Sequence, residues 1–225
     1  MNERVLLIDT SSMLGLCAVA QQKASGSWDI LFEQYINAES SHSEHLFMGI
    51  QTALSKTDIK FTDLKCVVYC AGPGSFTGLR ISYSAVKGFT LAQGIKSVGV
   101  STLRAMIYNL KDTPSKYRAA LIKGSGTEVF AFVTTKEGET LLKEGSYDIN
   151  YVLEVFGKAG ENEITCIGSG ARTYVDELKI IKAVNIPADN ELDKVTPLGM
   201  LSLLEENTID GINYLKASYA ENKSK

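Results

Sequence analysis

The chain has few histidines, the commonest metal-binding side chain. Its 225 residues include only two histidines, His42 and His45, three positions apart. Zinc sites need three or four ligands, and the nearest further candidates are Glu39 and Glu44. We therefore interpret the histidines as part of a solvated helix end, and we predict no metal site.

Several motifs and segments that define whole classes of protein are also absent. There is no G-x-S-x-G nucleophile turn, which argues against a Ser-His-Asp hydrolase. No apolar run approaches ~20 residues, and no basic-then-apolar leader precedes the first apolar run, so we expect a cytoplasmic protein with no membrane contact. The net charge is -3 and the basic residues are scattered, which is not typical of a protein that binds nucleic acid by itself.

Disulfide bonds are not predicted either. On one strand, Cys66 and Cys70 would lie ~13 Å apart. All four cysteines lie in apolar runs, which favours buried free thiols at Cys17, Cys66, Cys70 and Cys166.

What is present is a pattern of strands and helices that occurs twice. In the first half, we predict strands at 5–8, 14–20, 28–36, 66–71 and 97–100, and helices at 41–57, 79–93 and 102–110. Beyond Thr113-Pro114 the order repeats with almost no shared residues, and we predict strands at 119–123, 128–134, 141–145 and 164–167 and helices at 149–156 and 197–206. We therefore expect two α/β lobes, residues 1–112 and 113–225.

The segment 72–78, Gly-Pro-Gly-Ser-Phe-Thr-Gly, connects a buried strand to the second helix. It lacks the Lys-Ser/Thr of a P-loop, and its glycine spacing is one residue longer than the dinucleotide fingerprint. Backbone amides near Thr77 and Gly78 could hold an anion. Alternatively the segment is a tight turn, in which Pro73 fixes one φ and the glycines allow positive φ. The residues favour the tight turn.

The second predicted helix has small residues on one face. Ser84, Gly88 and Ala92 recur at intervals of four, with Ala85 beside them. This face packs either on the protein's own sheet or against a partner. Phe47, off the main apolar stripe of the first helix, would extend a partner surface.

Asp9 ends the first predicted strand and is followed by Thr10 and two serines. This position suits a metal or phosphate contact in a hairpin. It equally suits an aspartate that caps a turn through its own backbone, and the sequence leaves both open.

Several segments, taken in order, resemble the TsaB family, formerly YeaZ. They are Leu7-Ile8-Asp9-Thr10-Ser11, His42-Ser43-Glu44, Gly72-Pro73-Gly74-Ser75-Phe76-Thr77-Gly78-Leu79-Arg80, Lys87-Gly88 and Val100-Ser101-Thr102-Leu103. The G-P-G-S-F-T-G-L-R block is highly specific, and the agreement covers the first ~110 residues. Near the C-terminus, 212–216 resembles the family's P-x-Y-L-R ending.

This resemblance implies an α/β fold of the two-lobed actin-like, Hsp70-like ATPase type (ribonuclease H-like), with a smaller, degenerate second lobe. It also implies a non-catalytic subunit of the bacterial machinery that forms N6-threonylcarbamoyladenosine next to the anticodon of tRNAs reading ANN codons. Such a subunit pairs with the catalytic paralogue TsaD and supports recruitment of the ATPase TsaE, while TsaC supplies threonylcarbamoyl adenylate. It reaches tRNA through the complex, has no cofactor by itself, takes a nucleotide only at an interface in the complex, and forms a homodimer when TsaD is absent.

The resemblance also suggests roles for individual residues. The partner interface would comprise Leu46, Phe47, Ile50, Ser84, Ala85, Gly88 and Ala92. A structural loop would comprise Gly72, Pro73, Gly74, Ser75, Phe76, Thr77, Gly78 and Arg80, and a vestigial phosphate hairpin would comprise Asp9, Thr10 and Ser11. No catalytic residue is expected, because the paralogue's H-x-x-x-H is absent.

Two features leave questions open. Where the family usually has Asp-Ala-Arg, this chain has Lys123-Gly124-Ser125, so any role of that acidic and basic pair is in doubt. The alternative function is an active ATPase or phosphotransferase of the same fold that uses Asp9, with Gly168-Ser169-Gly170 as its second-lobe contact.

Overall fold

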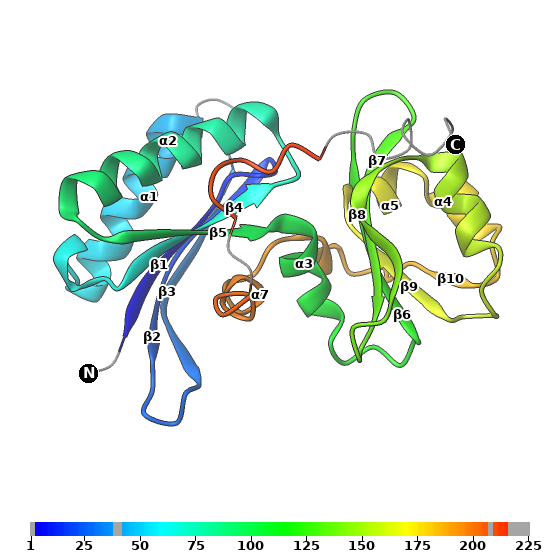
Figure 1. The fold of residues 1–225 in the computed structure, drawn as a ribbon, viewed down its shortest axis with the longest axis horizontal. Coiled ribbons are helices and arrows are strands. Elements are labelled where there is room, and N and C mark those ends of the chain that lie inside the picture. The colour runs from blue at the N-terminus through cyan, green and yellow to red at the C-terminus, as the bar shows by residue number, and fades with distance from the viewer. Residues whose placement is uncertain (1–2, 38–41, 207–208, 216–225) are drawn as a thin grey trace. The chain divides into compact units, whose positions relative to one another are not determined.

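The computed structural model describes residues 3–37, 42–206 and 209–215, with the side chains of 42 and 43 outside that description. The chain divides into two compact units (Figure 1). The first is assigned Met1–Ala105 and Val195–Asn213, and the second Met106–Lys194 and Tyr214–Lys225. This division differs from the expected lobes 1–112 and 113–225, because a late segment of the chain packs on the first sheet.

The first unit contains a five-stranded sheet in the order β3-β2-β1-β4-β5. Its strands are β1 (Arg4–Asp9), β2 (Leu14–Gln22), β3 (Trp28–Asn37), β4 (Cys66–Gly72) and β5 (Lys96–Ser101). β1 pairs antiparallel with β2 and parallel with β4, and β5 continues the parallel part. Because β1 and β4 are buried on both faces, their sequences are continuous apolar runs.

Helices cover both faces of this sheet. α1 (His42–Thr57) and α2 (Phe76–Gln93) lie together on one face, and the short α7 (Pro197–Leu201) lies on the other (Figure 1). On α1 the buried residues Leu46, Ile50 and Ala53 recur at helical spacing, so this stripe faces the sheet. A short helix α3 (Thr102–Ile107) follows β5 and ends in a 3-10 turn, Tyr108–Leu110.

The second unit has the same strand connectivity. Its sheet has the order β10-β9-β6-β7-β8, with strands β6 (Tyr117–Lys123), β7 (Glu128–Thr135), β8 (Thr140–Asp148), β9 (Ile164–Ile167) and β10 (Val184–Asn185). Again the first three strands are antiparallel and the last two are added in parallel. The predicted repeat is therefore confirmed. The second copy is reduced, since β10 has only two residues.

The helices of the second unit are α4 (Ile149–Phe156), α5 (Ser169–Thr173) and α6 (Val175–Lys179). A 3-10 turn, Asn190–Asp193, follows β10, and another, Phe61–Asp63, precedes β4 in the first unit. The helix α4 is as predicted. The helices α5 and α6 and the strand β10 were missed, because each has five residues or fewer and so shows little periodicity.

Some predicted boundaries need correction. The second helix begins at Phe76 rather than at residue 79, because the Ser75 side chain caps its first turn. The closing helix, predicted at 197–206, ends at Leu201. Ser41 of the predicted capping box and Glu39 lie outside the described residues.

All four cysteines are buried and free, as predicted. Among the described helices, none is long and apolar enough to cross a membrane.

Candidate functional site

The loop between β4 and α2 is a tight turn held by its own side chains. Gly72 and Gly74 have φ values of 118° and 158°, a region that side chains rarely adopt. Ser75 caps α2, since its hydroxyl accepts a hydrogen bond of 3.2 Å from the Gly78 amide. The amide of Ser75 donates to the carbonyl of Ser11 at 2.7 Å, so the loop is joined to the turn after β1.

The turn between β1 and β2 packs directly on this loop. The Thr10 hydroxyl donates to the Gly78 carbonyl at 2.7 Å. A Cβ atom at Gly78 would collide with the Thr10 carbonyl, and one at Gly74 with the backbone of Ser11. The glycines are thus needed for close contact between two backbone segments. This geometry supports the tight turn, because the glycines allow the loop and the hairpin to come into backbone contact.

Asp9 is enclosed at the centre of this arrangement. Its side chain is 2% exposed, and its Oδ1 accepts a hydrogen bond of 2.8 Å from the Ser11 amide. Burial raises the pKa of Asp9, while hydrogen bonds from Ser11, Cys70 and Thr10 act in the opposite direction. Asp9 therefore caps the turn through its own backbone, one of the two roles that the sequence left open.

Cys70 lies beside Asp9 in this buried cluster. Burial and the neighbouring carboxylate both raise the pKa of the Cys70 thiol. The residues described include no group of three or more His, Cys, Asp or Glu side chains that could hold a metal ion. His45 is half-buried on α1, and the side chain of His42 lies outside the description.

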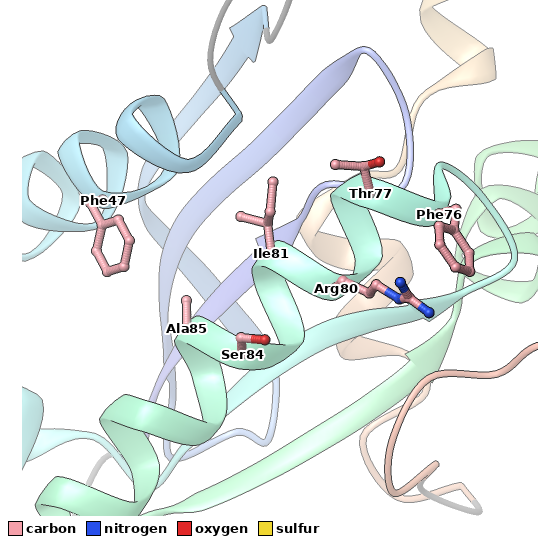
Figure 2. A pocket seen from close by; sticks show the side chains of 7 residues that line it. All are labelled: Phe47, Phe76, Thr77, Arg80, Ile81, Ser84 and Ala85. Carbon is pink, nitrogen blue, oxygen red and sulfur yellow. The ribbon is translucent and has the colours of Figure 1, made fainter.

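A groove lies between α1 and α2 on the outer face of the first unit. Its volume is about 540 Å³, and it is lined by Phe47, Phe76, Thr77, Arg80, Ile81, Ser84 and Ala85. Figure 2 shows Phe47 on α1 opposite Ile81 and Ala85 on α2. Phe47 is 50% exposed and Phe76 is 55% exposed, which is unusual for two phenylalanines in one groove.

The small-residue face of α2 is open. Ser84, Gly88 and Ala92 are exposed and Ala85 is half-buried. A Cβ atom at Gly88 would meet nothing within 4 Å, so this face does not pack on the protein's own sheet. Leu91, on the same helix, is 81% exposed.

Two residues expected at the partner interface are not available to a partner. Leu46 and Ile50 are each 2% exposed and belong to the core under the sheet. The apolar stripe that suggested them faces inward, whereas Phe47 faces outward on the same helix. Sequence reasoning missed Ile81 as a groove residue, and it placed Phe76 and Arg80 only in the loop. The Arg80 guanidinium stacks on the Phe76 ring at 3.7 Å from its centroid.

A segment near the C-terminus, Ile209–Asn213, lies across the first unit beside the loop and α2. The Asn213 amide donates to the Ala71 carbonyl at 2.8 Å, and the Tyr69 hydroxyl donates to the Gly211 carbonyl at 3.0 Å. Lys87 on α2 forms an ion pair of 2.9 Å with Asp210. Resemblance to the family ending at 212–216 was the only sequence signal for this segment, and Lys216 lies outside the described residues.

Hydrogen bonds between residues of the second unit hold its loops in place. The Lys123 ammonium donates to the carbonyls of Gly124 and Gly126 at 2.7 and 2.5 Å, and so holds the β6–β7 turn. The Gly168 amide donates to Asp193 at 2.7 Å, and the Ser169 hydroxyl accepts from the Lys123 amide at 3.1 Å. These groups contribute to the fold of the unit.

The chain is similar to one protein-family model and to individual curated proteins. A family model described as TsaD, tRNA N6-adenosine threonylcarbamoyltransferase, matches residues 36–180. The tRNA threonylcarbamoyladenosine biosynthesis protein TsaB of Escherichia coli (strain K12) is 30% identical over 147 residues, which cover 65% of this chain and 57% of that protein. TsaB of Bacillus subtilis (strain 168) is 29% identical over 107 residues, covering 47% and 44%. The chain thus spans about half the length of the curated relatives it matches.

Solved structures support the fold. A Pseudomonas aeruginosa protein with similarity to peptidase YEAZ aligns with a TM-score of 0.71 at 19% identity, covering 95% of this chain and all of that one. YeaZ from the same organism aligns with a TM-score of 0.66 at 20% identity, covering 90% of both chains.

Two units with one strand connectivity, a tight glycine loop after β4 and these structural neighbours define an α/β protein with the fold of the two YeaZ-like structures. The chain belongs to the family described as TsaD, tRNA N6-adenosine threonylcarbamoyltransferase, and curated proteins named TsaB are among its relatives. The resemblance to TsaB (YeaZ) stated from the sequence is therefore confirmed.

Proposed function

We propose that this protein is a non-catalytic subunit in the cytoplasmic synthesis of N6-threonylcarbamoyladenosine next to the anticodon of tRNAs reading ANN codons. In this proposal it binds the catalytic paralogue TsaD through the groove between α1 and α2. The complex then recruits TsaE, receives threonylcarbamoyl adenylate from TsaC and contacts tRNA. Without TsaD, the same face joins two copies of this chain.

The observation that carries the proposal is the exposed α1–α2 face. Phe47 and Phe76 offer large apolar rings, while Gly88 and its small neighbours allow a second backbone to approach closely. Central aromatic anchors beside a groove are typical of residues that dominate binding energy. The interface we propose therefore comprises Phe47, Phe76, Arg80, Ile81, Ser84, Ala85, Gly88 and Ala92.

The enclosed hairpin supports a role without catalysis. Asp9 is buried and bonded to its own turn, and the first turn of α2 is capped by Ser75 and covered by Thr10. We propose accordingly that the chain has no cofactor by itself and meets a nucleotide only at an interface in the complex.

To test the proposal, we would mix the purified chain with TsaD from the same organism and measure the mass of any complex between them by light scattering after gel filtration. Modified adenosine is then measured on tRNA in the presence of TsaC, TsaE and ATP. We expect a heterodimer, and modification that requires this chain. No complex, with modification independent of the chain, would contradict the proposal, and ATP hydrolysis by the chain alone that is lost in Asp9→Ala would favour the ATPase instead.

The interface is tested separately with Gly88→Trp and Phe47→Asp. Each should weaken the complex with TsaD at least tenfold. Gly88→Trp fills the open face of α2, and Phe47→Asp places a charge among apolar groups. Glu154→Trp is the matched control, since Glu154 is also exposed on a helix but lies in the second unit. Wild-type affinity in both groove variants would exclude this interface.

A further inference from the structure

The first unit has another pocket at the opposite end of its sheet from Asp9. It lies where β1 and β4 begin, and the six residues of β1 separate it from the hairpin by ~20 Å. Its volume is about 330 Å³, at the lower end of the ~300–1,000 Å³ typical of small-molecule sites. It shares no lining residue with the α1–α2 groove.

The lining of this pocket combines apolar and polar side chains. Val5, Cys66 and Val98 line it from the sheet, and Leu201 and Leu204 line it from α7 and the turn that follows. Val5 pairs with Cys66 in adjacent strands, so both side chains point to the same face of the sheet. These residues would receive an apolar group of limited size.

Four charged residues surround the apolar part, and only two of them pair with each other. Lys65 forms an ion pair with Glu3. Lys96 and Glu205 also line the pocket, and both are exposed. Within the described part of the chain, neither has an ion-pair partner. One ammonium and one carboxylate thus remain at the edge of an apolar pocket.

We propose that this pocket binds a free α-amino acid with an apolar side chain. Lys96 pairs with its carboxylate, Glu205 pairs with its ammonium, and its side chain packs against Val98, which lies two residues from Lys96 on β5. A ligand with a single charge would satisfy only one of the two residues, whereas a zwitterion matches both. The proposal is independent of the proposed function, because none of these residues belongs to the groove.

Trp28 provides a direct readout, because it is the only tryptophan in the chain and it lines the pocket. We would titrate the purified full chain with L-leucine, L-methionine and L-valine and follow tryptophan fluorescence, with calorimetry as a second measurement. A saturable change with at least one of them is expected. N-acetyl-L-leucine and L-leucinamide, which each lack one charge, should bind at least tenfold more weakly than L-leucine.

The variants Lys96→Gln and Glu205→Gln should each weaken binding at least tenfold. Both side chains are exposed, so the variants should keep the wild-type circular dichroism spectrum. Lys56→Gln is the control, since Lys56 is an exposed lysine on α1 that does not line the pocket. No saturable signal by either method up to about 10 mM, or equal binding of the singly charged derivatives, would overturn the proposal.

Discussion

The side-chain hydroxyl of Thr10 donates a hydrogen bond of 2.7 Å to the carbonyl oxygen of Gly78, across 68 positions of the sequence. The bond joins the turn after β1 to the first turn of α2. It fixes the start of the helix that presents the proposed partner face, and it closes the region in which Asp9 lies. The same contact thus connects the partner face with the buried carboxylate.

Replacing Thr10 by valine removes this bond while keeping the side-chain shape. We expect Thr10→Val to lower the free energy of unfolding by about 1–2 kcal/mol, because the bond is buried. Urea unfolding measures the effect. Thr52→Val is the control, since Thr52 donates to the Met48 carbonyl on the exposed side of α1, and its loss should stay within about 0.5 kcal/mol. If both variants lost the same free energy of unfolding, the hydrogen bond between hairpin and loop would contribute no more to stability than an exposed one.

Gly88 should be replaceable in the isolated protein. Gly88→Ala should raise the free energy of unfolding by about 0.5–1 kcal/mol, because alanine favours the helix and its Cβ meets open space. The comparison is Gly94→Ala, at a C-cap residue with φ of 67°, which should destabilise the protein by about 1 kcal/mol. Denaturant unfolding distinguishes them. Destabilisation by Gly88→Ala would mean that α2 is packed more tightly at this position than the structure shows.

Asp9 should make stability depend on pH. Burial raises the pKa of Asp9 in the folded state above 3.8, the ordinary value that applies in the unfolded state. At a pH between 3.8 and the raised pKa, the folded state therefore binds more protons than the unfolded state. The free energy of unfolding of the wild type should therefore fall, relative to Asp9→Asn, as pH rises through that interval. Urea unfolding from pH 4 to pH 7 tests the sign. Parallel profiles for the two proteins would contradict a raised pKa.

In the second unit, Arg172 holds Asp193 in place. Its Nε lies 2.6 Å from the Asp193 carboxylate, whose side chain is only 16% exposed. Arg172→Met should destabilise the protein by about 2–4 kcal/mol, because it leaves a largely buried carboxylate without its cation. Lys158→Met breaks the exposed pair with Glu154, and there the loss should be below about 0.5 kcal/mol. Guanidinium unfolding compares them, and similar small losses would exclude a structural role for the Arg172 pair.

The contact between the first sheet and the segment 209–213 can be tested at Tyr69. Tyr69→Phe removes a hydroxyl that donates to the Gly211 carbonyl at 3.0 Å and accepts from the Gly211 amide at 3.2 Å. We expect a loss of about 1 kcal/mol and faster amide hydrogen exchange in 209–213, because the half-buried amide and carbonyl of Gly211 lose their partner. Unchanged exchange there would show that the contacts of Ile209, Asp210 and Asn213 hold the segment without the Tyr69 hydroxyl.

The strands and long helices were predictable because each has a local signature. The run Val5–Ile8 is apolar because β1 is buried on both faces, and the helical stripe through Leu46 and Ile50 marks α1. Periodicity does not say what a stripe packs against, so it did not correct the resemblance, which assigned Leu46 and Ile50 to a partner although they face the sheet. The position of Phe47 off this stripe did indicate its exposure, whereas Phe76, at the start of α2, has no such signature.

By itself, the sequence determined the order of the longer strands and helices, the internal repeat and the family, since these depend on local patterns and on one specific glycine block. Only the tertiary structure decided that Asp9 is enclosed, that Gly78 is needed for contact with Thr10, and that the chain returns to Tyr69 through Gly211, 142 positions away. The physical reason is that burial and hydrogen-bond partners come from residues distant in sequence. No local pattern specifies which distant segments meet.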